Sequence, residues 1–246
     1  MGSNWAGVGT AYARSFASLC RGPVDRLLDG LDVARHSLLA DAAGNCPEGF
    51  AVAAGELPAL PFPDAAFERV VANFVVNHLR DPRAGVRELA RVSATGGRIA
   101  VTSWTAEPDA RAGLFARMVE RSAAVPPAGL RLPGHLDYER SATGLAGLLG
   151  EAGLAEVTAT TLTWDWRVSL EDLWAGVAAG VGGVGATYLA QDEPTRVRMR
   201  EELERAAAPL TEDGLVVLRV VAALAVGTRP SAGTPRGYHS GDRTVG

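Results

Sequence analysis

The stretch that decides the fold runs from Arg69 to Trp104 and reads RVVANFVVNHLRDPRAGVRELARVSATGGRIAVTSW. Residues 69–76 are an almost continuous apolar, β-branched run, typical of a parallel strand that is covered on both faces. Asp81-Pro82 then supplies a helix N-cap and a first-turn proline, and Gly96-Gly97 is expected to close that helix. A second apolar run follows at residues 98–104. The spacing predicts a strand, a helix and a strand joined by a right-handed parallel crossover.

Two helices are predicted ahead of this unit. Pro23 opens the second of them, whose apolar face includes Leu27 and Leu31. Residues 50–54 predict a short buried strand, and the prolines within residues 57–64 predict a loop. The first helix is indicated by apolar residues at helical spacing, namely Val8, Tyr12, Phe16, Leu19 and Cys20.

Beyond Trp104 the pattern is mainly helical as far as residue 215. Ser141 is expected to cap one helix, Ser169 with Asp172 forms a capping box for another, and the glycines of residues 180–185 predict a turn between helices. The other predicted elements are a helix over residues 114–119, a loop over 125–135, a strand over 157–166, a charged helix over 194–208, a last strand over 218–226 and a disordered tail over 231–246.

Composition narrows the class of partner. The chain has 246 residues, 47% of them hydrophobic, which is enough for one domain with a proper core. Its net charge is −4, whereas nucleic-acid-binding proteins carry an excess of basic residues that contacts the phosphates. A small-molecule substrate is therefore expected. Cys20 and Cys46 have no metal-ligand spacing, which indicates a reducing, cytoplasmic location. The most apolar window, residues 215–226, contains Arg219 and is shorter than the roughly 20 residues that span a bilayer, so no membrane is expected as partner.

Several of these stretches together resemble class I S-adenosylmethionine (SAM) dependent methyltransferases, specifically the small-molecule group called methyltransferase type 11. Residues 55–64 (GELPALPFPD) resemble the family's acidic loop after its third strand, and residues 67–81 resemble its fourth strand and following loop. Residues 96–104 resemble its fifth strand, and Glu151-Ala-Gly-Leu154 resembles the entry into its final antiparallel strands. The resemblance covers roughly residues 5–230 and is most specific in the middle third of the chain.

The resemblance implies a Rossmann-like α/β fold, with a mostly parallel sheet, an antiparallel last strand and helices on both faces. It implies one domain over residues 1–230, in which the mainly helical region 105–215 positions the substrate. SAM is then expected at the carboxyl ends of the strands. By this resemblance, Glu56 and Leu57 match the family's position for the adenine of SAM, and Asn73 and Phe74 match its position for the methionine part. Asn77 and His78 match the turn that faces the substrate.

Transfer of a methyl group from SAM needs an aligned acceptor atom and sometimes a base. His78 is the candidate base, and the alternative is that it caps or packs in a loop after a strand. His135 and Tyr138 either face the substrate or belong to an exposed loop. Trp174, with Trp164 and Trp166, either lines an aromatic substrate pocket or packs in the core.

One part of the family's pattern is missing from the sequence. The family needs a Gly-x-Gly loop after its first strand, because a Cβ would block the cofactor, yet nothing between Leu27 and Phe50 offers one. If Leu31 to Ala34 were that first strand, only the 15 residues from Arg35 to Gly49 would precede the strand at Phe50. A single crossover takes a dozen residues or more. We therefore expect Leu31 to belong to the second helix, and the fold to be truncated at its first βαβ unit.

This truncation leaves two functions open. The chain is either a SAM-dependent methyltransferase of a small molecule, or a methyltransferase-like protein that does not bind SAM and serves as a binding partner, a scaffold or a catalyst of a cofactor-free rearrangement. A truncated product without a function of its own is a third hypothesis. The loss of a central strand also exposes sheet edges, which either the strand at Phe50 or a second copy of the chain in a homodimer would cover.

Overall fold

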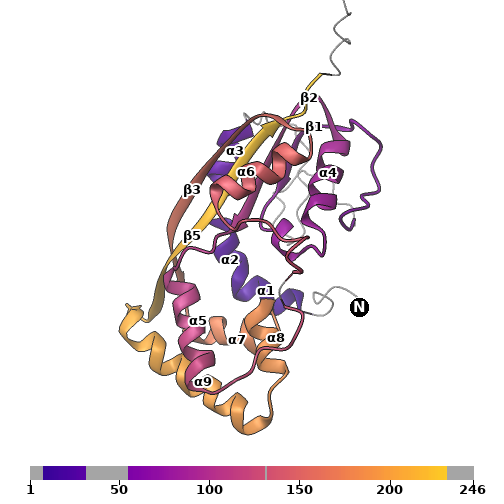
Figure 1. Cartoon of the computed structure of the whole chain (residues 1–246). Helices are drawn as coiled ribbons and strands as arrows, with labels where there is room; N and C mark the ends of the chain where they lie inside the picture. The colour runs from indigo at the N-terminus through magenta and orange to yellow at the C-terminus, as the bar shows by residue number, and fades with distance from the viewer. Residues whose placement is uncertain (1–7, 32–54, 131, 232–246) are drawn as a thin grey trace, which may run out of the picture.

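The computed structural model describes residues 8–31, 55–130 and 132–231. A twisted sheet has helices on both faces, and further helices gather at one end of it (Figure 1). Its order is β1-β2-β5-β3, with β4 paired to β5. The strands are β1 (Phe67–Ala72), β2 (Ser93–Trp104), β3 (Ala155–Val168), β4 (Thr211–Glu212) and β5 (Leu215–Thr228).

The α-helices surround this sheet in chain order, with two short 3-10 helices between them. The α-helices are α1 (Gly9–Arg14), α2 (Phe16–Arg21), α3 (Val24–Leu31), α4 (Pro82–Val92), α5 (Ala110–Arg121), α6 (Ala142–Glu151), α7 (Leu170–Ala178), α8 (Gly182–Leu189) and α9 (Glu193–Ala207). The 3-10 helices are η1 (Val76–His78) and η2 (Ala208–Leu210).

The predicted strand, helix and strand are present as β1, α4 and β2, and the two strands pair in parallel. Asp81 caps α4 as predicted, because its carboxylate accepts a hydrogen bond from the backbone N–H of Ala84 at 2.9 Å. The glycine pair does not close the helix, however. α4 ends at Val92 and β2 begins at Ser93, so that Gly96 and Gly97 lie within the strand, Gly96 with a φ of 75°.

β1 is shorter than the sequence predicts. The apolar run continues to Val76, but the strand ends at Ala72 because Phe74 takes a left-handed backbone conformation with a φ of 55°. Its backbone N–H donates to the hydroxyl of Thr102 on β2 instead of continuing the ladder. The chain then enters η1, and these residues leave the sheet for the space beyond its carboxyl end.

The two faces of the sheet carry different helices. α3 packs Leu27 and Leu31 against Ala100 of β2, whereas α4 and α6 pack against the neighbouring residues Ile99 and Val101. Because successive side chains of a strand point to opposite faces, α3 lies on the face opposite to α4 and α6. Leu31 is therefore part of a helix, as the spacing argument predicts.

A second core lies where β3 and β5 run on past β2. Residues 98–104 of β2 pair with residues 222–228 of β5, and the first half of β5 pairs with β3 and β4. Figure 1 shows α5, α7, α8 and α9 gathered at this end of the strands. The fully buried residues of this second core include Leu114, Met118, Leu173, Met199, Leu203, Leu218 and Val220.

Most elements predicted beyond Trp104 are confirmed, including the cap at Ser141 and the capping box of Ser169 and Asp172. Two further predictions need correction, the first of them near the start of the chain. The first predicted helix is interrupted at Ser15, whose φ of −102° and ψ of −85° leave the helical region and whose hydroxyl donates to the carbonyl of Ala11. The glycine-rich turn is shorter than expected, because α8 already begins at Gly182.

Some predictions fall outside the described residues. These are the strand over residues 50–54, the junction that follows Leu31 and the tail beyond residue 231. Among the described strands, β1 and β2 form the parallel pair, and the other three pairings are antiparallel. None of the described helices is long and apolar enough to cross a lipid bilayer.

Candidate functional site

A cavity of about 780 Å³ opens at the carboxyl ends of β1 and β2. This is the end of an α/β sheet at which ligands bind, and the volume is in the range of small-molecule sites. The helices α1, α2, α5 and α8 supply one side of its wall. The loop at residues 55–57, the segment after β1 and the last residue of β2 supply the rest. The cavity thus lies between the end of the sheet and these four helices, which we call the helical group.

Asn73 ties three elements together at the base of the cavity. Its Oδ1 accepts a hydrogen bond from the hydroxyl of buried Thr102 on β2 at 2.7 Å, and its Nδ2 donates to the carbonyl of Cys20 on α2 at 2.8 Å. Thr102 Oγ1 in turn accepts the backbone N–H of Phe74 at 2.9 Å. This chain of hydrogen bonds holds Phe74 in its left-handed conformation, which is costly for a residue other than glycine.

Aromatic rings form the wall above this base. Phe74 stacks on Trp104, with ring centroids 3.8 Å apart and planes 12° apart. The guanidinium carbon of Arg111 lies 4.1 Å from the centroid of the Trp104 ring. Phe16 and Phe115 lie close together and also line the cavity. The cavity therefore combines flat apolar surfaces with a few polar groups.

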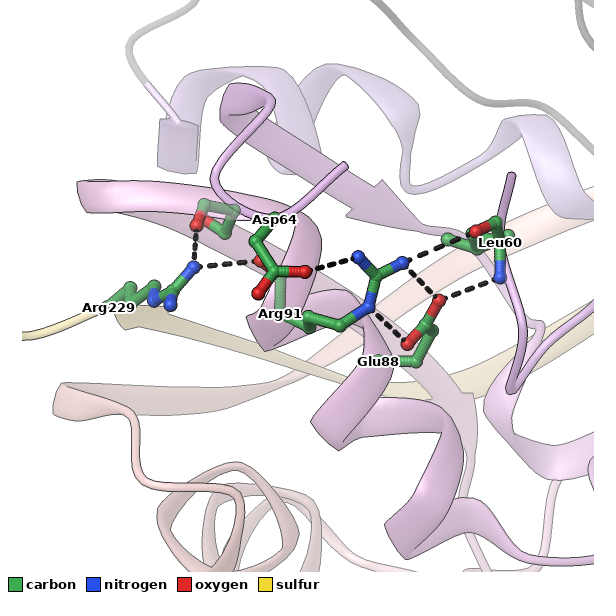
Figure 2. Close-up of polar contacts among 6 residues, drawn as sticks. Leu60, Asp64, Glu88, Arg91 and Arg229 are labelled. Carbon is green, nitrogen blue, oxygen red and sulfur yellow. Dashed lines mark hydrogen bonds and ion pairs between the residues drawn. The ribbon is translucent and has the colours of Figure 1, made fainter. Parts of the chain in front are cut away.

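An ionic network of Glu88, Arg91 and Asp64 fixes the loop that follows Glu56 and Leu57 (Figure 2). The Glu88 carboxylate accepts the backbone N–H of Leu60 at 2.7 Å and two bonds from Arg91, at 2.7 and 2.8 Å. Arg91 also donates to Asp64 at 2.6 Å and to the carbonyl of Leu60 at 3.3 Å. The hydrogen bonds from Arg91 lower the pKa of Glu88, so the carboxylate stays charged.

The far end of the network reaches β5. Arg229, one residue after that strand, donates to the main-chain carbonyls of Arg91 and Ser93 (Figure 2). The backbone N–H of Ala65 also donates to the carbonyl of Arg91 at 2.9 Å. The end of α4 thus fixes the proline-rich loop at one side and the C-terminal end of the sheet at the other.

His78 lines the cavity from η1. Burial in the protein and the positive charge of Arg140 lower the pKa of the imidazole from 6.5 to about 4. More than a third of the residue remains exposed, so water screens part of this effect. His78 is neutral at pH 7.

The structure gathers five of the residues singled out from the sequence in this cavity: Glu56, Leu57, Asn73, Phe74 and His78. Four others are not among its described lining residues. Asn77 has a buried side-chain oxygen without a hydrogen-bond partner in the described chain, and His135 is exposed in a loop. The hydroxyl of Tyr138 lies 2.5 Å from Ser103 Oγ, and Trp174 packs against Tyr188 and beneath Arg200 in the second core.

Sequence reasoning missed Trp104, Arg111 and the start of α8 as parts of the cavity wall. The sequence predicts Trp104 only as the end of a strand, and Gly182 and Gly183 only as part of a turn. Arg111 lies in the first turn of α5, where the helix dipole disfavours a positive charge, but the sequence predicts that helix only over residues 114–119 and therefore gives no sign of this placement.

Comparison with known proteins gives consistent matches. A family model described as a methyltransferase domain matches residues 6–101. Demethylmenaquinone methyltransferases from Mycobacterium sp. strains KMS and MCS are each 30% identical to this chain over 172 residues, which is 60% of this chain and 75% of theirs. An Anabaena variabilis structure, named as a methyltransferase from an antibiotic biosynthesis pathway, has a TM-score of 0.53 and 14% identity, covering 85% of this chain and 99% of that one. The predicted Rossmann-like methyltransferase fold class is confirmed.

Replacing Thr102 by Val should destabilise the protein. The change keeps the shape of the side chain but leaves the Phe74 N–H and Asn73 Oδ1 without their partner, which should lower the free energy of unfolding by about 1–3 kcal/mol. Urea denaturation measures the loss. Thr160→Val on β3, where the side chain is exposed, is the matched control and should change stability by less than about 0.5 kcal/mol. Equal effects of the two variants would contradict this role for Thr102.

The ionic network should depend on Glu88 more than on Asp64. Glu88→Gln keeps the side-chain volume but removes the charge that two Arg91 bonds and the Leu60 N–H satisfy, so the loop should loosen and unfolding should become easier. Asp64→Asn alters an ion pair whose acid is 74% exposed and should have a smaller effect. Amide hydrogen exchange should show faster exchange across residues 55–64 in the Gln variant alone. Unchanged exchange there would refute the bracing role.

Because the pKa of His78 is lowered in the folded protein, protonation of its imidazole should reduce the free energy of unfolding at low pH. The folded imidazole should stay neutral until pH falls well below 6.5, while the unfolded one protonates near 6.5. Stability is therefore fully present above pH 6.5 and falls as pH drops from about 6.5 towards about 4. NMR titration, with His78→Gln to assign the imidazole resonance, checks the midpoint. A midpoint at or above 6.5 would overturn the prediction.

Proposed function

We propose that this chain, which belongs to the class I SAM-dependent methyltransferase family, transfers a methyl group from SAM to a small molecule held in the cavity. The observation that carries the proposal is that one cavity collects Glu56, Leu57, Asn73, Phe74 and His78 from two stretches of chain, the loop at residues 55–57 and the segment at residues 73–78. These are the positions at which the family holds its cofactor and its acceptor. The helical group closes the other side of the same space.

The described residues fit the cofactor. The loop at Glu56 and Leu57 offers an acidic acceptor beside an apolar contact, and it is braced by Glu88 and Arg91. Gly9 and Gly183 line the cavity, and no atom of the described residues lies within 4 Å of where a Cβ would be, so the described chain leaves the space before them open. Glu56 and Leu57 would hold the adenosine part of SAM, and Asn73 and Phe74 the methionine part. When bound, SAM supplies an electrophilic methyl group on a sulfonium sulfur.

The chain's own residues supply alignment and a proton acceptor. The stacked rings of Phe74 and Trp104 orient a flat acceptor and exclude water from it. His78 lines the cavity and is neutral at pH 7, so its imidazole is our candidate for the base that takes the proton an acceptor O–H or N–H must lose. Its lowered pKa makes it a weak base, which suits an acceptor whose own proton is acidic.

The relatives narrow the acceptor. Demethylmenaquinone methyltransferases act on a quinone-type ring, and the stacked aromatic wall of this cavity suits a flat ring of that class. We infer a small aromatic acceptor in a cytoplasmic protein. Whether the chain forms a homodimer stays a prediction.

A methyltransferase-like protein that does not bind SAM is the alternative function. One sequence observation favours it, since no Gly-x-Gly stands between Leu27 and Phe50. On that alternative the same cavity holds a small molecule for binding or for a cofactor-free rearrangement. The two functions differ in a single measurable property, which is affinity for the cofactor.

Calorimetric titration with S-adenosylhomocysteine, the product form of the cofactor, tests the proposal. We expect one site with micromolar affinity. Glu56→Ala should weaken it about tenfold by removing an acceptor of hydrogen bonds, whereas Glu68→Ala on β1, an exposed carboxylate that does not line the cavity, should leave it unchanged. No heat at millimolar ligand would reject SAM-dependent transfer and favour the alternative.

A further inference from the structure

The cavity contains a positive charge that its described protein partners do not satisfy. Arg111 lines the cavity with its side chain only 18% exposed, and its Nε has no hydrogen-bond partner in the described part of the chain. We propose that Arg111 binds an anionic oxygen of the methyl acceptor, so that the substrate class is a planar aromatic acid, phenolate or enolate. This inference rests on the proposed function, because it assigns the acceptor's place in the same cavity.

The contacts of Arg111 with protein are few for a buried guanidinium. Within the described chain it makes a polar contact with Asp109, at 3.5 Å from Nη2 to Oδ2, the outer limit of a hydrogen bond. A guanidinium carries five N–H donors, and burying them without partners costs free energy. Burial accordingly lowers the pKa of Arg111, although the group stays charged at pH 7.

Asp109 is not free to move closer to Arg111. Its Oδ1 caps α5 by accepting the Ala112 N–H at 2.6 Å, and its Oδ2 accepts the Val221 N–H of β5 at 3.2 Å. Its side chain is 2% exposed. The carboxylate is thus committed to the main chain, and the first turn of α5 adds the partial positive charge of a helix N-terminus beside Arg111. A ligand oxyanion would complete the coordination.

The surroundings of Arg111 indicate a flat ligand. The guanidinium lies over the ring of Trp104, which stacks on Phe74, and such stacking keeps the plane of the guanidinium fixed. Phe115, one turn along α5, and Phe16 of α2 line the same part of the wall. An aromatic ring with an anionic oxygen at its edge satisfies both features, since the ring packs on the aromatic wall and the oxygen meets Arg111.

The carboxylate of SAM is the other anion that this cavity could offer to Arg111. Arg111 belongs to α5 in the helical group, whereas the residues proposed for the cofactor lie on the 55–57 loop and at the end of β1. The position therefore favours the acceptor as the source of the oxyanion. An experiment separates the two sources, because each ligand is titrated by itself.

The probes are 1-hydroxy-2-naphthoate and its methyl ester, which share a ring system but differ in negative charge at pH 7. Calorimetry on the wild-type chain should show the acid binding at least about tenfold more tightly than the ester, as expected for a charge-assisted hydrogen bond. Arg111→Met should abolish this preference while ester binding stays within about threefold of the wild type. Arg111→Lys should keep part of it. Arg117→Met, an exposed change on the same helix, is the matched control and should keep all of it.

Circular dichroism checks that each variant folds. S-adenosylhomocysteine is titrated in parallel, and its affinity for the Arg111→Met variant should equal its affinity for the wild type. If that affinity falls while the naphthoate preference persists, Arg111 binds the cofactor's carboxylate and the inference is overturned. It is also overturned if the wild type binds neither naphthoate probe or does not prefer the acid. If S-adenosylhomocysteine fails to bind the wild type but the acid preference still depends on Arg111, the anion site stands and SAM-dependent transfer falls.

Discussion

The continuous pairing of β5 is the constraint on which the rest of the structure depends. One strand of 14 residues, Leu215–Thr228, pairs with β2 along its second half and with β3 along nearly its whole length. Residues at its start belong to the helical core, and residues near its end belong to the core beneath α6. Because the same hydrogen-bonded strand enters both cores, the helical group is held in a fixed position against the carboxyl ends of β1 and β2. The cavity exists because of this placement, since its two sides come from the two halves of the molecule.

Two polar networks then fix the residues that line the cavity. Asn73 links β1, β2 and α2 through Thr102 and the carbonyl of Cys20, and in doing so it turns Phe74 onto Trp104. The Glu88–Arg91 pair does the same for the loop after residue 55. Both networks join groups that are distant in sequence, so each stabilises a tertiary contact more than a local structure. In each network a buried side-chain oxygen accepts a main-chain N–H, namely Thr102 Oγ1 from Phe74 and Glu88 Oε1 from Leu60. Each bond fixes a segment that apolar packing alone would leave free.

The sequence predicted the elements well where periodicity and capping agree. The parallel unit of β1, α4 and β2, the cap at Asp81 and the capping box at Ser169 follow from local rules and are present. The end of β1 could not be predicted, because the apolar run to Val76 gives no sign that Thr102 captures the Phe74 N–H. Five predicted site residues meet in the cavity because the loop at residues 55–57 and the segment after β1 both line it. Arg111 was missed because its role depends on burial between Trp104 and a committed Asp109, which no spacing reveals.

The central claim is that one cavity holds the cofactor on its sheet side and an anionic aromatic acceptor on its helical side. The cofactor part of this claim follows from the chain's family, whereas the anionic aromatic acceptor is a substrate class that the fold alone does not specify. A crystal structure of the chain grown with S-adenosylhomocysteine and 1-hydroxy-2-naphthoate tests the claim most directly. The account predicts the adenosine against Glu56 and Leu57, the naphthoate ring against Trp104, and its carboxylate within hydrogen-bond distance of Arg111. Density for neither ligand in the cavity, or a naphthoate bound away from Arg111, would contradict it.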